Sequence, residues 1–274
     1  MNARGLDDTG GPQQWYDSLP FVTKNWLTLS VGTTVLANIG VIPIMKLYYS
    51  FDDIRNNFEI WRLITPFVYI GPFKFETVIA LFLLYQYSKQ YEGGVCFNTG
   101  SGGGTADYMY MLMLGMLVIV VSGTFIQLGV FFGKTLVYYV LYVWSKRNPT
   151  AQASIWGVPM QGMYLPFALL ALNTMLGNYV IDMIHGIVVG HLYYFMVDVV
   201  PKVYGKDYIV TPLFLIQKFG IGEYVPPAPT NGMGAVGSNT FARPGTVNGP
   251  RDPAASTTSS GHNWGTGGQR LGRD

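Results

Sequence analysis

Charged residues are scarce in this sequence. Only 12% of its 274 residues are Asp, Glu, Lys or Arg, whereas 49% are hydrophobic and 15% are aromatic. Soluble globular domains carry about 25% charged residues. The shortage of charge therefore excludes an ordinary soluble domain and indicates a chain that faces lipid.

Cysteine and basic runs are lacking too. Cys96 is the single cysteine, and no second cysteine or histidine cluster lies near it, so neither an internal disulfide nor a zinc site is expected. The net charge is only +2 and no basic stripe exists, which excludes nucleic acid as an expected partner. The Gly-rich segment 98–107 lacks the Gly-Lys-Ser/Thr of a phosphate loop and predicts a flexible linker. No metal or cofactor site is expected.

The first twenty residues also lack the apolar run of a cleavable signal peptide, and they contain Asp7, Asp8 and Asp17. We expect the first hydrophobic helix to direct membrane insertion.

What the sequence does contain is a series of stretches without charge. A charge in hydrocarbon costs roughly 2.5 to 3.5 kcal/mol, so these stretches outline membrane spans. Several are short beside the roughly 20 residues of a usual span, and Asn148–Pro149 predicts a loop over 150–162. The six predicted spans are residues 22–42, 77–88, 108–129, 130–147, 164–179 and 183–197, the last ending before Pro201.

These spans predict an all-α, polytopic membrane protein. The six-helix domain covers residues 22–217, between an N-terminal segment, 1–21, and a Gly- and Pro-rich tail, 218–274, that is expected to be disordered. Six crossings put both termini on one side, and the positive-inside rule assigns that side to the cytosol. Eight basic residues then lie on the cytosolic side and four opposite: Arg4, Lys24, Lys89, Lys146, Arg147, Lys202, Lys206 and Lys218 against Arg55, Arg62, Lys74 and Lys134.

A set of motifs follows in order between Trp15 and Pro212. They read FEIWRLITPFVYIG, LFLLYQYSKQYEGG, ADYMYMLMLG, LYVWSKRNP, YLPFALLALN and GIVVGHLYYF. Together they resemble the Derlin family of rhomboid-like pseudoproteases. The resemblance implies a rhomboid-like bundle in the endoplasmic reticulum (ER) membrane, acting without catalysis in ER-associated degradation. It also implies an ER ubiquitin-ligase complex and misfolded protein clients as partners.

Two pairs of residues in these motifs are candidate sites. Trp61 and Arg62 form a membrane-loop motif, because an indole and a guanidinium both suit the lipid headgroup layer, where Arg62 would reach phosphate. An ordinary interfacial anchor is the alternative, and the resemblance implies that the pair holds an embedded loop. Gly186 and Gly190 lie four residues apart on one helix face and predict close helix packing.

Catalytic residues are not expected. An active rhomboid needs Gly-x-Ser-Gly and a histidine, and the first motif is absent from the chain. The resemblance places residues 131–134, which lack a hydroxyl, near the nucleophile position, and Met183 at that of the histidine. We interpret Ser122 as a packing or backbone-bonding serine, and His185 as the partner of Asp182 at a helix end.

Polar side chains at membrane depth are the other candidates. Gln86, Asn173 and Asn178 lie within or beside predicted spans, as do Asn38, Gln127 and Asp182. Interhelical hydrogen bonding is one explanation for each. Combined with the family resemblance, they suggest a polar groove which, with thinning of the bilayer by short spans, passes misfolded proteins to the cytosol.

The tail carries a further motif, HNWGTGGQRLG. Trp264, Gly268, Gln269 and Leu271 resemble the SHP box that recruits the valosin-containing AAA+ ATPase, although Thr266 replaces its first Gly. A chance Gly-rich terminus is the alternative. Two other functions remain open, a six-span secondary transporter and an intramembrane protease, although no inverted repeat supports the transporter.

Overall fold

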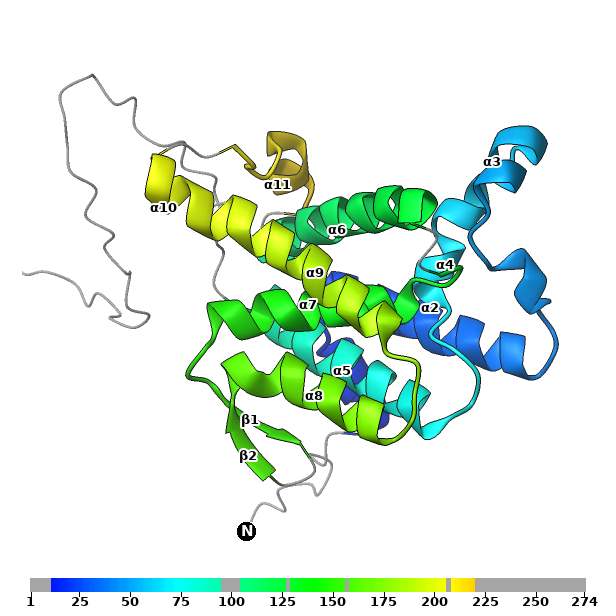
Figure 1. The fold of residues 1–274 in the computed structure, drawn as a ribbon, viewed down its shortest axis with the longest axis horizontal. Coiled ribbons are helices and arrows are strands. Elements are labelled where there is room, and N and C mark those ends of the chain that lie inside the picture. The colour runs from blue at the N-terminus through cyan, green and yellow to red at the C-terminus, as the bar shows by residue number, and fades with distance from the viewer. Residues whose placement is uncertain (1–10, 95–103, 127–128, 156–157, 206–207, 220–274) are drawn as a thin grey trace, which may run out of the picture. The chain divides into compact units, whose positions relative to one another are not determined.

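The computed structural model describes residues 11–94, 104–126, 129–155, 158–205 and 208–219 (Figure 1). About three quarters of this part of the chain is helical. All of the described residues lie within one compact unit. The predicted tail motif of Trp264, Gly268, Gln269 and Leu271 lies outside the described residues.

Helices occupy the places of the six predicted spans. Two are long and apolar enough to cross a membrane: α6, with a mean hydropathy of 2.2, and the continuous helix Ile181–Tyr204, with 1.5. The chain is a polytopic helical membrane protein, while the number of six crossings stays a prediction. The helices are α2 (Phe21–Asn38), α5 (Phe75–Glu92), α6 (Gly104–Ile126), α7 (Gly133–Arg147), α8 (Leu165–Met175) and α9 (Ile181–Tyr194).

Shorter elements fill the connections. The predicted loop at 150–162 contains an antiparallel hairpin, in which Gln152 lies opposite Gln161. Between α2 and α5 the chain forms η1 (Ile44–Lys46), α3 (Phe51–Asn57), η2 (Ile60–Leu63) and α4 (Thr65–Val68). The other short elements are α1 (Pro12–Asp17), β1 (Gln152–Ile155), β2 (Val158–Gln161), η3 (Gly162–Tyr164), η4 (Phe195–Val199), α10 (Val200–Tyr204) and α11 (Leu213–Phe219).

Helix α7 lies at the centre of the bundle and contacts α5, α6, α8 and α9 (Figure 1). Twelve of its 15 residues are buried. Tyr138 and Tyr139 are both at most 2% exposed and supply much of this core. A helix surrounded by others has no outer face to leave polar, which is why α7 carries large side chains on all sides.

The second span is longer than predicted. Helix α5 has 18 residues because it includes Glu76, Lys89 and Glu92. Glu76 lies 2.5 Å from the ammonium of Lys134 on α7, and Glu92 accepts hydrogen bonds from the start of α2. A charge that is paired within the protein does not have to end a helix at the membrane surface.

The prediction that the sixth span ends before Pro201 is wrong. The helix is continuous for 24 residues, from Ile181 to Tyr204. Residues Phe195–Val199 form a π-helix, and Pro201 lies in the first turn of α10 directly after it. The π-turn changes the hydrogen-bond register, which lets the chain pass a proline without ending the helix.

The linker also ends earlier than the predicted range, 98–107. Residues from Gly104 onward form the first turn of α6. Asp107 accepts a hydrogen bond of 2.6 Å from the hydroxyl of Thr211 and is 3% exposed. This bond holds the start of α6 to the segment before α11.

Candidate functional site

Gln86 lies in a polar cleft at the C-terminal end of α5. The cleft has a volume of about 410 Å³. Ser18 and Pro20, from the segment before α2, form one wall, and Tyr85, Lys89 and Gln90 of α5 line the other side together with Gln86. Of the predicted groove residues, Gln86 thus has room beside it for another molecule.

Asn173 and Asn178 are hydrogen-bonded to each other through their side-chain amides. Asn173 is 3% exposed, and its Nδ2 donates to the carbonyl of Leu169 at 2.9 Å. Its Oδ1 accepts from Nδ2 of Asn178 at 3.0 Å. The two amides therefore close the turn between α8 and α9 and also reach Tyr138 Oη, 3.4 Å from Asn173 Nδ2.

Gln86 and the asparagine pair lie at different depths along α7. Tyr87, next to Gln86, packs against Trp144 with ring centroids 4.6 Å apart. Asn173 contacts Tyr138, six residues earlier on the same helix. At 1.5 Å per residue this is roughly 9 Å along the helix axis. Gln127 lies outside the described residues.

Asn38 has a structural role at the end of α2. Its Nδ2 donates to the carbonyls of Thr34, at 2.7 Å, and Gly71, at 3.1 Å. Its Oδ1 accepts from the backbone N–H of Phe73 at 3.0 Å. These bonds fasten the chain before α5 to α2.

Trp61 and Arg62 point in different directions. Trp61 is 51% exposed, whereas the side chain of Arg62 is only 7% exposed. The Arg62 guanidinium donates to the carbonyls of Met45 and Tyr48, at 3.1 and 3.0 Å. The expectation that it reaches lipid phosphate is therefore wrong, because these protein groups take its donors.

Two acids complete the surroundings of Arg62. Glu59 forms an ion pair and hydrogen bond with its Nε, and Asp53 lies 3.5 Å from its Nη2. Burial lowers the pKa of Arg62, but the hydrogen bond to Glu59 and the charges of Glu59 and Asp53 raise it by more, so the pKa lies above its ordinary value. Arg62 thus stays charged and joins η1, α3 and η2 into one unit.

Gly186 and Gly190 face α7. A Cβ added at Gly186 would collide with the carbonyl oxygen of Thr135. One added at Gly190 would lie 3.1 Å from the carbonyl oxygen of Tyr139 and from Cβ of Tyr142. The two glycines let the backbones of α7 and α9 approach more closely than side chains would permit.

Ser122 and His185 form a pair that the sequence did not suggest. Ser122 Oγ lies 2.7 Å from His185 Nε2, so the predicted pairing of His185 with Asp182 is wrong. The carbonyls of Val118, at 2.7 Å, and Ile119, at 3.2 Å, compete with the imidazole for the single proton of this hydroxyl. With that proton on a carbonyl, Nε2–H of the imidazole is the donor of the pair; in the other tautomer the hydroxyl donates to Nε2.

Residues 131–134 precede or open α7. Phe132 is 1% exposed and packs on Phe67, with ring centroids 5.5 Å apart. The ammonium of Lys134 is held by Glu76 at 2.5 Å. The place near which the family resemblance puts a nucleophile is thus taken by an aromatic cluster and an ion pair.

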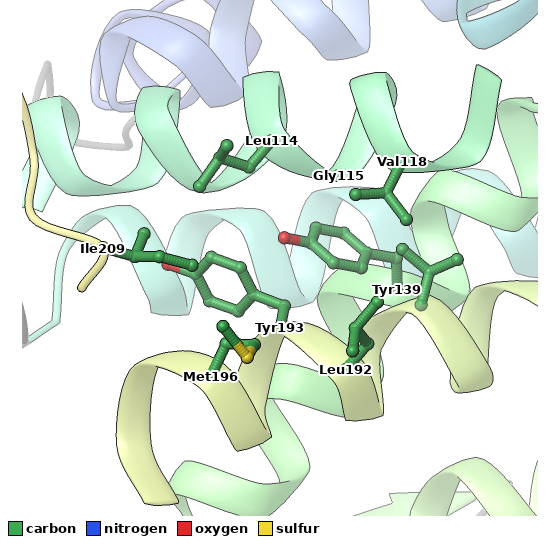
Figure 2. Close-up of a pocket in the computed structure, with 9 residues that line it drawn as sticks. Leu114, Gly115, Val118, Tyr139, Leu192, Tyr193, Met196 and Ile209 are labelled. Atoms are coloured by element: carbon green, nitrogen blue, oxygen red, sulfur yellow. The ribbon is translucent and has the colours of Figure 1, made fainter. Parts of the chain in front are cut away.

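An apolar pocket of about 230 Å³ lies between α6 and α9. Figure 2 shows Leu114 and Val118 of α6 above the rings of Tyr139 and Tyr193. The Tyr139 hydroxyl donates to the carbonyl of Met111 at 2.9 Å and is not free to act on a ligand. This pocket suits an apolar group and carries no acid–base chemistry.

Two buried charges were not predicted from the sequence. Arg147 is 2% exposed and binds Asp198 through two nitrogens, at 3.1 and 2.9 Å. Glu92 is 5% exposed and accepts from the N–H groups of Val22 and Thr23. The sequence did contain an indication of both residues, since an ionisable residue at the edge of an apolar run usually has a protein partner.

Comparison with known proteins agrees with the motifs. The chain matches the Der1-like family over residues 19–213. It is 35% identical to Derlin-1.1 of Zea mays over 230 residues, which cover 80% of this chain and 93% of the relative. It is 33% identical to Derlin-1 of Oryza sativa subsp. japonica over 242 residues, covering 84% and 97%, and 33% identical to Derlin-1 of Arabidopsis thaliana over 232 residues, covering 83% and 85%.

Proposed function

Because the chain belongs to the Der1-like family, we propose that it is a non-catalytic component of ER-associated degradation that assists the retrotranslocation of misfolded proteins across the ER membrane. The observation that carries this proposal is the family match over residues 19–213. That range runs from just before α2 to the first residue of α11 and so includes the whole helical bundle.

Short helices support a role in thinning the bilayer. Helices α7 and α8 have 15 and 11 residues. At 1.5 Å per residue they are roughly 23 and 17 Å long, whereas the hydrocarbon core is about 30 Å thick. A bilayer that thins to match them lowers the barrier to moving a polar chain. Helices α5 and Ile181–Tyr204 are longer than the spans predicted from the sequence, so α7 and α8 are the helices that would thin the bilayer.

The polar groove of the proposal begins at Gln86. Its cleft opens at the end of α5, and the amides of Asn173 and Asn178 lie roughly two turns deeper along α7. A client chain passing between these levels would exchange hydrogen bonds with amides instead of with water.

In this proposal the tail recruits the ATPase that provides the driving force. Trp264, Gly268, Gln269 and Leu271 would recruit the valosin-containing AAA+ ATPase to the cytosolic face, where both termini are expected. An ER ubiquitin-ligase complex would deliver and mark the clients. The chain itself then serves as conduit and adaptor.

A pull-down of the ATPase from detergent extract tests the tail. We expect the intact chain to retain the ATPase and a Trp264→Ala, Leu271→Ala variant to lose it. A Phe241→Ala, Val247→Ala variant removes two apolar tail residues outside the motif and should bind normally. Equal binding by all three chains would contradict recruitment through the motif.

Photo-crosslinking tests the groove. A photoreactive residue at Gln86, Asn173 or Asn178 should crosslink a stalled client, whereas one at Leu117, which is 59% exposed on α6, should crosslink lipid. Client crosslinks of equal yield at Leu117 would contradict a defined groove.

The intramembrane protease alternative has a direct test. The bonding of Ser122 to Val118 supports the non-catalytic assignment. A fluorophosphonate probe should leave the purified chain unlabelled, and covalent labelling of a serine would overturn that assignment.

A further inference from the structure

The cleft beside Gln86 is rich in hydrogen-bond donors. The amides of Gln86 and Gln90 and the ammonium of Lys89 line it. In the part of the chain that the structure describes, neither amide has a hydrogen-bond partner, and no acid lies within ion-pair distance of Lys89. Tyr85 Oη accepts from Trp15 Nε1 at 3.1 Å and keeps its own proton to donate.

The acids nearest in the sequence to the cleft are already occupied. Both oxygens of Glu92 accept from the start of α2, at 2.9 Å from Val22 N and 2.8 Å from Thr23 N. Asp17 pairs with Lys24 at 2.9 Å. The cleft therefore has a positive charge and several free donors, which is the environment that an anion with many acceptor oxygens requires.

The aromatic residues at the cleft indicate its depth. Trp15 is 46% exposed and stacks on Tyr85, with ring centroids 5.3 Å apart. Trp and Tyr gather at the boundary between hydrocarbon and water. The cleft also lies where α5 ends and α2 begins. Lipid phosphate is the most abundant anion in that layer.

We propose that, while no client chain occupies it, the cleft formed by Ser18, Tyr85, Gln86, Lys89 and Gln90 binds the phosphate of an anionic phospholipid headgroup. Lys89 supplies the charge, and the amides of Gln86 and Gln90 and the Tyr85 hydroxyl donate to the phosphate oxygens. Its volume of about 410 Å³ holds a phosphodiester with the atoms on both sides of it. A choline headgroup would bring its cation toward Lys89, so the cleft selects a headgroup of net negative charge.

Binding of spin-labelled phosphatidylserine to the full chain in phosphatidylcholine bilayers tests this site. Lys89→Gln should weaken the tightest binding about fivefold, since one basic residue near the surface contributes about that factor. Gln86→Glu should weaken it at least as much, because the introduced carboxylate would face Lys89 one turn away and neutralise it. Both variants should keep the thermal stability of the parent chain, since neither residue is in the core.

Lys202→Gln is the matched control, because it removes the same charge from an exposed lysine on α10. It should change binding by less than about twofold, as expected for a distant surface charge. Unchanged binding in Lys89→Gln, or an equal loss in Lys202→Gln, would overturn the proposal. Displacement of the lipid by millimolar inorganic phosphate would assign the cleft to a free anion and overturn the lipid assignment.

Discussion

At the scale of single residues, Arg147 is the most consequential charge in the bundle. It joins the end of α7 to Asp198 in the π-helix η4 and to the hydroxyl of Tyr91 on α5. Its guanidinium also lies over the rings of Tyr91 and Tyr193, at 5.4 and 5.7 Å. A buried cation held by so many partners stabilises only as long as its acid remains.

Arg147→Met should lower the free energy of unfolding by about 3 to 5 kcal/mol, because Asp198, whose side chain is only 12% exposed, would lose its ion-pair partner. The double variant Arg147→Met, Asp198→Leu should recover much of this loss. Unfolding in mixed micelles measures both. Lys24→Met breaks an exposed pair and should cost less than about 1 kcal/mol. If the double variant lost as much stability as Arg147→Met and Asp198→Leu lose together as single variants, this account would be contradicted.

Gly186 allows a matched comparison with another helical glycine. Gly186→Ala places a methyl group against the Thr135 carbonyl and should destabilise the fold by about 1 to 3 kcal/mol. Gly32→Ala on α2 enters open space and should stabilise it by about 0.5 to 1 kcal/mol through backbone entropy. Thermal unfolding in detergent measures both stability changes. If both substitutions changed stability in the same direction, α7 and α9 would not be in the close backbone contact described here.

At the scale of elements, α2 receives its N-terminal cap from another helix. Pro20 precedes α2 and offers no side-chain hydrogen bond. Glu92, at the end of α5, accepts from the N–H groups of Val22 and Thr23 and from the Thr23 hydroxyl. The carboxylate also suits the positive end of the α2 dipole. One residue thus ends α5, starts α2 and sets the two antiparallel helices in register.

Glu92→Gln should weaken this junction by about 1 to 3 kcal/mol, because the amide turns one donor toward N–H groups that need acceptors. Hydrogen exchange of the amides of residues 22–24 should increase while exchange in α9 stays the same. Asp52→Asn, an exposed acid in the first turn of α3, should cost less than about 1 kcal/mol. Unchanged exchange at residues 22–24 would contradict the capping role.

At the scale of the whole molecule, the arrangement of the termini is a prediction with a direct test. In a Cys96→Ser background, a cysteine at Ser259 should react with an impermeant maleimide on sealed ER microsomes. A cysteine at Asn57, in the exposed end of α3, should react only after detergent is added. The reverse pattern would place the tail in the lumen and would contradict recruitment of a cytosolic ATPase by the tail.

The existence and order of the main helices could be predicted because the cost of placing charge in hydrocarbon acts on each segment separately. The family could be predicted as well, because its motifs are local and keep their order along the chain. The helix bounds could not, since a count of uncharged residues starts α5 too late, after Glu76, and ends the last helix too early, before Asp198.

The sequence by itself determined the helical membrane class and the family. Only the tertiary structure decided which charges are neutralised, which glycines lie at a helix contact, and that Arg62 faces the protein and not the lipid. The physical reason is distance along the chain. Glu92 and Thr23 are 69 residues apart, Lys134 and Glu76 are 58, and Arg147 and Asp198 are 51. No local pattern reports such pairs, because they form when the helices pack.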